Sequence, residues 1–332
     1  MKVIATVPFI PGHEAVGTVV KSGPTSSLRA GVRVGVENHF FCSDCYTCRE
    51  DRGDICATMN QYGHGRGTQH GGFSEYSIVS SKYCYVFKTE MPFLSGVLME
   101  PLGVAHNGVE TIQVSGHQVL IIGAGPIGLL AAQCAAAAGQ FFLASPSYFL
   151  PHTSHHISHL TPHILLEIIA GSTKIILADM NAGRLQLAKE MKVSCELVTL
   201  DTSKVNLLEE IMKLTDNCGV ARLVEATGAP PVVNSCFKLL RKGARIVMIG
   251  LPKATVQIED PLPNLIFKSV TLTTVHGRRI FHTWEQCEQL IEQGKIDPTV
   301  IVSHQFTLDK WQEAHDVLLS GQACKIVVKM SR

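Results

Sequence analysis

The sequence predicts an α/β protein with a doubly wound parallel sheet and a second, β-rich domain. The first observation is size: 332 residues with 45% hydrophobic content suffice for a large core and for two domains. The second is the first hundred residues, which read as short strands between glycine-rich turns. The third is the pattern from Gln118 onward, where apolar strand runs each lead into an amphipathic helix. Strands that alternate with helices are typical of a parallel sheet covered on both faces.

The strands of the β-rich part are expected in four segments. These are "AVGTVVKSG", "RVGVE", "GGFSEYSIV" and "YCYVFK". After Gly277 the chain has two helical segments, "TWEQCEQLIEQG" and "LDKWQEAHDVLLSG", with a strand around Ile301 and a last strand "KIVV".

Four closely spaced cysteines form the first chemical motif, "FFCSDCYTCREDRGDIC". Cys42, Cys45, Cys48 and Cys56 follow the pattern C-x2-C-x2-C-x7-C. Thiolates are preferred ligands of tetrahedral zinc, and C-x2-C steps let consecutive sulfurs reach one ion about 2.3 Å away. Because four sulfurs fill the coordination shell, this zinc would be structural. Four reduced thiols, an iron–sulfur site and a zinc ribbon for nucleic acid are the alternatives; the iron–sulfur pattern would need an x3-C-P step that is absent here.

A glycine-rich turn forms the second motif. The segment "VLIIGAGPIG" places Gly123, Gly125 and Gly128 as G-x-G-x-x-G after an apolar strand and at the start of a helix. In this context the pattern favours a dinucleotide site. Gly123 would permit the tight turn, Gly125 would let the backbone approach a pyrophosphate, and Gly128 would let the helix pack on the strand. The helix N-terminus would attract the phosphates. A tight turn without a ligand is the alternative.

Such a site also requires an acidic residue about 20 positions further on. The candidate is Asp179 in "KIILADMNAGR", which follows Gly128 by 179 − 128 = 51 residues. A carboxylate at the end of the second strand accepts hydrogen bonds from a ribose diol and repels a 2′-phosphate, which favours NAD over NADP. Arg184 would line the adenine side, and a solvated helix residue is the alternative for it.

The excess spacing corresponds to residues 140–171, "QFFLASPSYFLPHTSHHISHLTPHILLEIIAG". This segment is rich in histidine, proline and serine and has neither helical nor strand periodicity. We interpret it as an insertion and favour, as a hypothesis, a stretch that splicing would normally remove. A genuine surface insertion and a histidine-rich metal site are the alternatives.

The charge balance excludes some classes of partner. Lys plus Arg total 29 and Asp plus Glu total 28, so no excess of charge points to nucleic acid or to an anionic membrane. The sequence contains no apolar run long enough to span a bilayer, and "MKVIATVPFIPGHE" lacks the cleavage site of a secretory signal. The eleven cysteines are an odd number, which favours reduced thiols. We expect small molecules and other protein chains as partners and a cytoplasmic location.

With a four-cysteine lobe followed by a dinucleotide turn, the chain resembles the zinc-dependent medium-chain dehydrogenases. "GHEAVGTVV", the cysteine cluster, "GGFSEY", "MEPLGVAHNG" and "GAGPIG" carry the resemblance, which covers nearly all of the chain outside residues 140–171. It implies a GroES-like catalytic domain at 1–108, an NAD-binding Rossmann domain at 109–277, and a C-terminal portion at 278–332 that completes the catalytic domain. "ENHFFC", "LIFKSVTLTTVHGRRIFHTW" and "VSHQFTLDKWQEAHDVLLSGQACKIVV" are most similar to the L-threonine 3-dehydrogenases.

The resemblance implies a second, catalytic zinc. His13 and Glu14 of "GHE" match zinc ligands, Glu100 of "MEP" matches an acidic residue that serves ligation or proton relay, and His39 matches a histidine near the substrate. A catalytic zinc keeps an open position and lowers the pKa of a bound alcohol, which can then expel hydride toward the nicotinamide. From the residues alone, a structural His–Glu pair and a helix-initiating Glu100 stay open.

By the same resemblance, further residues are expected at the NAD nucleotide. They are Ile127, Ile249, Gly250, Leu251, Val275 and His276. Without the resemblance, the isoleucines and the valine read as core residues.

The expected activity is NAD- and zinc-dependent hydride transfer from a secondary alcohol. L-Threonine, giving 2-amino-3-oxobutanoate, is the first candidate substrate, and sorbitol or another polyol is the alternative. Family members carry a cysteine zinc ligand in a longer N-terminal β segment, whereas the sequence starts at Met1, so an inactive NAD-binding scaffold from a truncated gene model is a further alternative. The family also implies a homo-oligomer, either dimer or tetramer, and the threonine subgroup leaves a mitochondrial location open.

Overall fold

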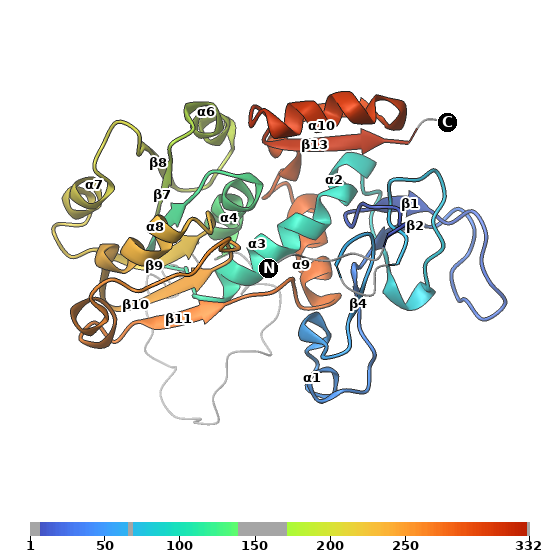
Figure 1. Ribbon diagram of the computed structural model, residues 1–332, viewed down its shortest axis with the longest axis horizontal. Coiled ribbons are helices and arrows are strands. Elements are labelled where there is room, and N and C mark those ends of the chain that lie inside the picture. Colours follow the sequence, from blue (N-terminus) through green and yellow to red (C-terminus); the bar gives the residue numbers. More distant parts are fainter. Residues whose placement is uncertain (1–6, 66–68, 139–170, 331–332) are drawn as a thin grey trace, which may run out of the picture. The chain divides into compact units, whose positions relative to one another are not determined.

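The computed structural model describes residues 7–65, 69–138 and 171–330 (Figure 1). The chain divides into two compact units. The first combines residues 1–107 with 276–332, and the second comprises residues 108–275. Within the described ranges, every helix is too short or too polar to cross a membrane.

The second unit is built on a six-stranded sheet. All of its strand pairs are parallel, and the strand order is β11-β10-β9-β6-β7-β8. The strands are β6 (Gln118–Ile122), β7 (Lys174–Asp179), β8 (Glu196–Asp201), β9 (Val220–Glu225), β10 (Leu240–Met248) and β11 (Thr271–Thr274). The order reverses between β6 and β9, and because parallel crossovers are right-handed, the connecting helices cover opposite faces. The predicted doubly wound parallel sheet is confirmed.

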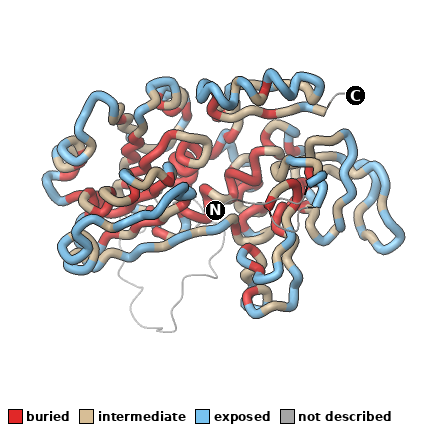
Figure 2. The backbone as a smooth tube through the Cα atoms, in the orientation of Figure 1, coloured by how far each residue is buried: buried red, intermediate tan, exposed pale blue. Residues whose placement is uncertain are grey.

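The helices of this unit follow their strands in alternation. They are α4 (Pro126–Ala137), α6 (Ala182–Glu190), α7 (Leu207–Leu214) and α8 (Pro230–Ser235), with the short elements η5 (Cys236–Leu239) and η6 (Leu262–Ile266). Strands β6, β7 and β9 are buried almost throughout, which explains their continuous apolar runs (Figure 2). Helix α4 is buried along most of its length, as its alanine-rich sequence permits.

The predicted insertion at 140–171 lies outside the described residues except for Gly171. The two sides of the segment are linked by a hydrogen bond, in which Ser172 N donates to Ala135 O at 3.1 Å. Gly116 N also donates to Gly171 O at 3.0 Å. A Cβ on Gly171 would lie 2.2 Å from Ala136 O. The chain therefore resumes beside the last turn of α4.

The first unit contains three small sheets. An antiparallel sheet has the order β1-β2-β5, β3 pairs with β4, and β12 pairs in parallel with β13. The strands are β1 (Val16–Thr18), β2 (Arg33–Val36), β3 (His39–Phe40), β4 (Asn60–Gln61), β5 (Cys84–Val86), β12 (Val302–Thr307) and β13 (Lys325–Lys329). The helices are α1 (Tyr46–Arg49), α2 (Phe93–Val97), α9 (His282–Glu292), α10 (Trp311–Leu319) and most of α3 (Met99–Thr111), whose residues 108–111 belong to the second unit. The 3-10 turns are η1 (Gly53–Ile55), η2 (Ser81–Tyr83), η7 (Pro298–Ile301) and η8 (Leu308–Lys310).

One expected strand is absent from this unit. The segment "GGFSEYSIV" forms no assigned strand; instead Gly71 N donates to Ile10 O at 2.7 Å and Phe73 N donates to Pro11 O at 3.0 Å. A Cβ on Gly71 would lie 2.3 Å from Gly12 O, so the two backbones approach too closely for a side chain. The glycines thus serve close packing here, which the strand prediction did not consider.

Helix α9 ties the C-terminal part of the chain to the N-terminal part. The Trp284 ring stacks on Tyr85 at 5.3 Å between centroids. The buried Glu288 carboxylate accepts hydrogen bonds from the Tyr85 hydroxyl at 2.6 Å and from the Lys88 and Thr89 amides at 2.7 and 2.8 Å. A fully paired buried carboxylate fixes the helix in one place, so segments about 200 positions apart form one unit.

Candidate functional site

The glycine turn follows β6 in the second unit. Gly123 has a φ of 104°, and a Cβ there would lie 2.9 Å from Thr227 Cγ2. A Cβ on Gly128 would lie 1.7 Å from Gly123 O, so the start of α4 touches the turn backbone. For Gly125, by contrast, the nearest described atom to a Cβ is Arg184 Nη1 at 4.0 Å. Packing therefore requires the first and third glycines, while the middle one faces an open side.

The start of α4 is available to a ligand. Gly125 is the N-cap residue, and no side chain among the described residues caps this end by a hydrogen bond. The first amides of a helix lack intrahelical partners and carry the positive end of its dipole. An anion that approaches over Gly125 would meet these amides.

Asp179 ends strand β7 next to the turn. Its Oδ2 accepts a hydrogen bond from Ala124 N at 2.6 Å, and its Oδ1 accepts one from Asn181 N at 2.7 Å. Asn181 in turn caps α6 through Arg184 N at 3.1 Å. The Arg184 Nε is buried and has no hydrogen-bond partner among the described residues. A buried unpaired donor beside an open glycine turn fits an anionic ligand such as a dinucleotide.

Two loops at the carboxyl ends of β9 and β10 lie together. Ile249 N and Gly250 N donate to Glu225 O at 2.9 and 3.0 Å. The fully buried Glu225 carboxylate accepts hydrogen bonds from Thr227 N at 2.8 Å and from Gly228 N at 3.1 Å. A Cβ on Gly250 would lie 2.1 Å from Gly228 N. Glu225, which the sequence did not suggest as a functional residue, thus holds the loop that contains Ile249 and Gly250.

The remaining residues expected at the nucleotide are placed differently. Ile127 lies half-buried in the first turn of α4, and Leu251 is 81% exposed. Val275 N lies 3.5 Å from Met248 O at the end of the second unit. His276 begins the C-terminal part of the first unit.

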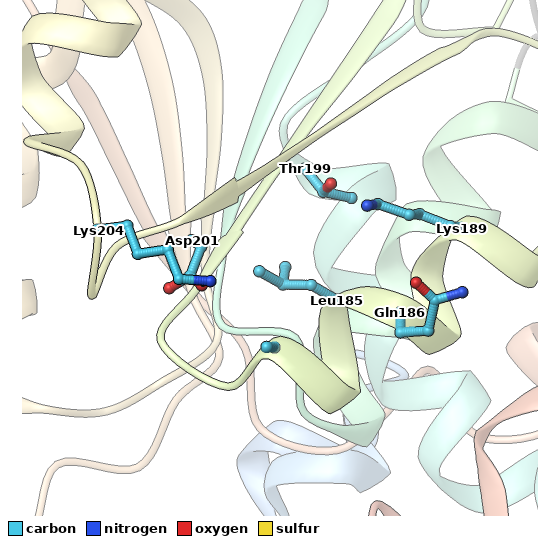
Figure 3. Close-up of a pocket in the computed structure, with 7 residues that line it drawn as sticks. Leu185, Gln186, Lys189, Thr199, Asp201 and Lys204 are labelled. Carbon is cyan, nitrogen blue, oxygen red and sulfur yellow. The ribbon is translucent and has the colours of Figure 1, made fainter.

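A cavity of about 270 Å³ also lies in the second unit, between α6 and the end of β8 (Figure 3). Lys204 pairs with Asp201 at its rim, with Nζ 2.8 Å from Oδ2. The lining residues are Ala182, Leu185, Gln186, Lys189, Thr199, Asp201 and Lys204. None of the predicted site residues lines this cavity.

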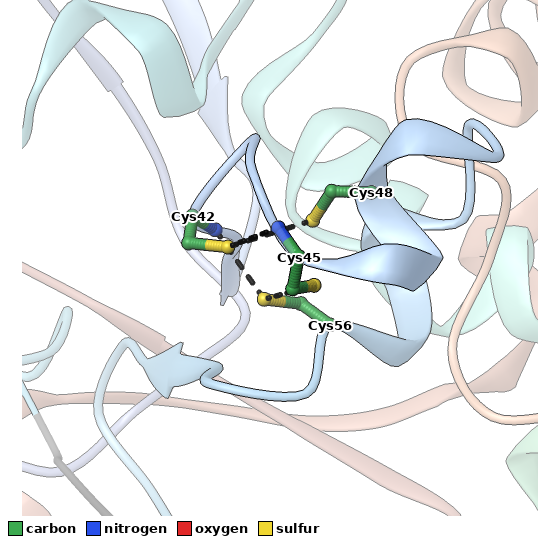
Figure 4. A group of neighbouring side chains, drawn as sticks. All are labelled: Cys42, Cys45, Cys48 and Cys56. Carbon is green, nitrogen blue, oxygen red and sulfur yellow. Dashed lines mark hydrogen bonds between the residues drawn. The ribbon is translucent and has the colours of Figure 1, made fainter.

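The four cysteines converge in the first unit (Figure 4). The Cys42 and Cys48 sulfurs are 3.9 Å apart, the Cys45 and Cys56 sulfurs are 3.8 Å apart, and all four lie within 4.8 Å of one another. A tetrahedron whose centre lies about 2.3 Å from each sulfur has edges of roughly 3.8 Å. The four side chains therefore already have the spacing of a tetrahedral zinc shell.

Hydrogen-bond donors surround these sulfurs. Cys45 N donates to Cys42 Sγ at 3.3 Å, and Cys42 N donates to Cys56 Sγ at 3.3 Å. The Thr47 hydroxyl and nearby backbone amides lower the pKa of Cys45 to about 5, and the Thr58 hydroxyl with two amides lowers that of Cys42 to about 7. Desolvation and the neighbouring sulfurs raise the pKa of Cys48 to about 12. The loop thus favours the thiolate, the form that binds metal, at Cys42 and Cys45 but not at Cys48.

A second group of metal-ligating side chains consists of His13, Glu14 and Glu100. Their ligand atoms lie within 4.8 Å of one another, and His13 Nε2 is 4.0 Å from Glu14 Oε1. Imidazole nitrogen and carboxylate oxygen are zinc donors, so the set fits that ion. The Glu14 carboxylate also pairs with Lys325 of β13, whose Nζ donates to Oε1 at 2.6 Å. Lys325 and a metal ion would compete for this carboxylate.

Three more histidines lie around this group. The His64 ring is 4.3 Å from the His13 ring, and the His39 ring is 5.2 Å from the His276 ring. Burial and the adjacent His13 lower the pKa of His64 to about 4, so His64 is neutral at pH 7. His276 Nδ1 lies 3.1 Å from the Asp54 carbonyl oxygen in the η1 turn of the cysteine lobe. His64 was not predicted, because none of the motifs quoted from the sequence includes it.

His39 is held by Glu37. Both its backbone N and its Nδ1 contact Glu37 Oε1, at 3.0 and 2.8 Å. Burial alone would raise the pKa of Glu37, but Arg278, His39 and Trp284 together lower it to about 2. Glu37 and Arg278 have no exposed surface, and the sequence analysis missed both. The only signal was the presence of charged residues within the segments "GVENHF" and "HGRRIF".

Comparisons with known proteins match the N-terminal part of the chain and the part that contains most of the parallel sheet. The family model "Alcohol dehydrogenase GroES-like domain" matches residues 1–89, and the model "Zinc-binding dehydrogenase" matches residues 164–293. An L-threonine 3-dehydrogenase of Edwardsiella ictaluri is 29% identical over 326 residues, which cover 98% of this chain and 84% of that protein.

Two solved structures show the same fold. The alcohol dehydrogenase TADH of Thermus sp. ATN1 superposes with a TM-score of 0.80 at 21% identity, covering 98% of this chain and 85% of that one. The dehydrogenase rspB of E. coli CFT073, complexed with NADH, superposes with a TM-score of 0.78 at 22% identity, covering 99% and 85%.

Proposed function

The chain belongs to the zinc-dependent medium-chain dehydrogenases, and we propose that it oxidises the secondary alcohol of L-threonine to 2-amino-3-oxobutanoate with NAD. Membership makes the chain an oxidoreductase that uses NAD and zinc on a small molecule. The choice of an amino-acid substrate is the proposal. It is supported by the L-threonine 3-dehydrogenase that is 29% identical and by the charges around Glu100.

The charge balance of the metal group is the observation that carries this choice. Lys325 neutralises Glu14, and Arg278 offsets one of the two carboxylates of Glu37 and Glu100. A divalent ion would therefore leave an excess of positive charge, surrounded by four imidazoles that donate or accept hydrogen bonds. The carboxylate of a zwitterionic amino acid could pair with this charge while its ammonium group donates to an imidazole, whereas an uncharged polyol offers neither group.

The first unit would supply the groups that act on the substrate. His13, Glu14 and Glu100 would hold the zinc, which when bound lowers the pKa of the substrate hydroxyl. Glu37 holds Nδ1 of His39, so the proton of this ring lies between them and Nε2 is left as an acceptor. His39 would therefore orient the substrate by accepting a hydrogen bond from its ammonium group. Cys42, Cys45, Cys48 and Cys56 would hold the structural zinc.

The second unit would bind NAD. The diphosphate would lie over Gly125 at the start of α4, and Arg184 would donate its unpaired Nε to the nucleotide. Asp179 would accept hydrogen bonds from the hydroxyls of the adenosine ribose. Because Ala124 N already donates to Asp179 Oδ2, this carboxylate would accept from the amide and the ribose together. Ile127, Ile249, Gly250, Leu251 and Val275 of this unit would line the rest of the nucleotide, whereas His276 belongs to the first unit and its expected contact rests on the family resemblance alone.

The test is NADH formation by the purified full chain with L-threonine, with sorbitol as the competing substrate. Glu100→Gln should abolish turnover, whereas Glu110→Gln, the same change at an exposed position of α3, should leave it unchanged. Turnover of sorbitol without turnover of threonine would replace the proposed substrate by a polyol. Binding of NADH with one zinc per chain and no turnover would favour the scaffold. Light scattering would check the expected dimer or tetramer.

A further inference from the structure

Arg278 is a completely buried cation whose donors are all engaged. In the sequence it falls after β11 and before α9, and it belongs to the first unit. Its Nε donates to Glu37 Oε2 at 3.0 Å, and its Nη2 donates to Glu37 Oε1 and Asn38 Oδ1, both at 2.9 Å. Its Nη1 donates to Glu100 Oε1 at 2.7 Å and faces Glu100 O at 3.4 Å. These acceptors match the five N–H groups of a guanidinium.

Packing against Trp284 and Gly103 fixes the position of the Arg278 side chain. Its Cζ lies 5.4 Å from the centroid of the Trp284 ring, and Trp284 Nε1 donates to Glu37 Oε2 at 2.8 Å. A Cβ on Gly103 of α3 would lie 2.6 Å from Arg278 Cδ, so a glycine makes room for the side chain. The planar guanidinium and its acceptors therefore form a rigid assembly.

Stability alone does not account for such an assembly. Burying a charged triad costs several kcal/mol of desolvation per ion, and apolar side chains of similar volume are often at least as stabilising. Buried polar networks do fix orientation, because their geometry is specific. Arg278 contacts two carboxylates with functional neighbours: Glu100 belongs to the metal group, and Glu37 holds His39.

The two carboxylate oxygens of Glu100 have different surroundings. Oε1 accepts from Arg278 Nη1 at 2.7 Å and from Asn38 Nδ2 at 2.9 Å, which occupies both of its lone pairs. Among the described residues no group donates to Oε2, which leaves this oxygen as the ligand atom for a metal ion.

We propose that Arg278 and Glu37 are positioning residues, Arg278 turning Glu100 Oε2 toward the zinc and Glu37 turning His39 Nε2 toward the substrate. The proposal rests on the proposed function in two respects, the zinc ion that Glu100 would help to hold and the substrate that His39 would contact. Arg278 acts on the metal through Glu100, and Glu37 acts on the substrate through His39.

Two variants separate these tasks. Arg278→Lys keeps a buried positive charge but loses the planar fork that reaches Glu37 and Glu100 together. Glu37→Gln keeps the shape and can still accept from His39, but it places an amide N–H₂ against the guanidinium. Arg279→Lys is the matched control, because Arg279 is the next residue and pairs only loosely with the exposed Asp51, at 3.5 Å.

The first readout is metal affinity without turnover. Zinc is titrated from the protein with a chromophoric chelator, and the four-cysteine site provides an internal reference. Arg278→Lys should weaken the more weakly held zinc about 10- to 100-fold, as outer-sphere changes typically do, while the cysteine-bound zinc is unchanged. Wild-type affinity at both sites in a folded Arg278→Lys protein would overturn the proposal for Arg278.

The second readout is the division between kcat and KM. Glu37→Gln should raise KM for the alcohol or lower kcat at least tenfold, while KM for NAD stays within about twofold, because the second unit is unaffected. Equal loss toward both substrates would indicate a folding defect and overturn the proposal for Glu37. If the wild type oxidises no alcohol, the proposed function fails, whereas the chelator titration still decides the role of Arg278. Arg278→Lys could fail to fold, and Glu37→Gln then decides alone. If its kcat and KM equal those of the wild type, the positioning roles of both Arg278 and Glu37 are overturned.

Discussion

Alanine at two glycines of the same turn should affect different properties, stability at Gly128 and NADH binding at Gly125. A methyl group on Gly128 would lie 1.7 Å from Gly123 O, whereas ordinary contacts begin near 3.4 Å. The helix start would have to move by about 1.7 Å against a backbone atom, which places the cost at the upper end of overpacking, about 3 kcal/mol. For a unit of this size, that corresponds to a fall in Tm of roughly 6–12 °C.

Gly125→Ala should fold and bind NADH poorly. Its methyl group would meet no described atom closer than 4.0 Å, and the φ of −70° suits alanine. Loss of a favourable N-cap costs about 1 kcal/mol or less, or roughly 2–4 °C. The same methyl group would occupy the open side where the diphosphate has to approach. Losing one charge-assisted hydrogen bond, about 1.5–3 kcal/mol, would weaken NADH binding roughly 10- to 100-fold.

The assay combines NADH fluorescence titration with thermal unfolding. Gly23→Ala in the first unit is the control, because no described heavy atom lies within 4 Å of its added Cβ. Wild-type NADH affinity in Gly125→Ala would refute the placement of the diphosphate. A Gly128→Ala protein with the Tm of the wild type would refute the packing argument.

Three other changes test separate features. Deleting residues 140–170 should leave the protein at least as stable and NADH affinity unchanged, because Ser172 N already donates to Ala135 O across the deleted segment and a shorter connection costs less entropy to close; a lower Tm would contradict this. Acid should destabilise the first unit through Glu37, whose pKa is about 2 in the folded protein and 4.5 ordinarily. The ionised carboxylate stabilises the fold fully above pH 4.5. This stabilisation, on the order of 3 kcal/mol, is lost as the pH falls from 4.5 toward 2. Tryptophan fluorescence during acid titration measures it, and Glu37→Gln should flatten the dependence. Lys325→Met should tighten the more weakly held zinc several-fold because Glu14 loses its competing partner, and chelator competition that shows equal or weaker binding would exclude Glu14 as a ligand.

Local patterns in the sequence predicted the sheet and the groups that lie within one segment. The apolar runs of β6 and β7 and the helices between them follow from periodicity, and the parallel sheet confirms that inference. The Cys42–Cys56 loop could be recognised because ligand spacing on one short segment is a local property. Which residues of these groups act on NAD and zinc stays a prediction.

Long-range partners could not be predicted in the same way. Glu37 and Arg278 are separated by 241 positions, and Glu14 and Lys325 by 311. No periodicity connects such pairs; they meet because α9 and β13 fold back onto the N-terminal part of the chain. "GGFSEYSIV" was misread for a related reason, since its glycines are explained by the backbone of Gly12, a partner 59 positions away.

The contact between His276 and the η1 turn makes chelation an ambiguous probe of this enzyme. A reagent such as EDTA that emptied the cysteine loop would also release the imidazole that rests on the Asp54 carbonyl. Activity could then fall while the other ion was still bound. Inactivation by a chelator should therefore be followed by counting the metal that leaves, since the first ion lost need not be the one that meets the alcohol.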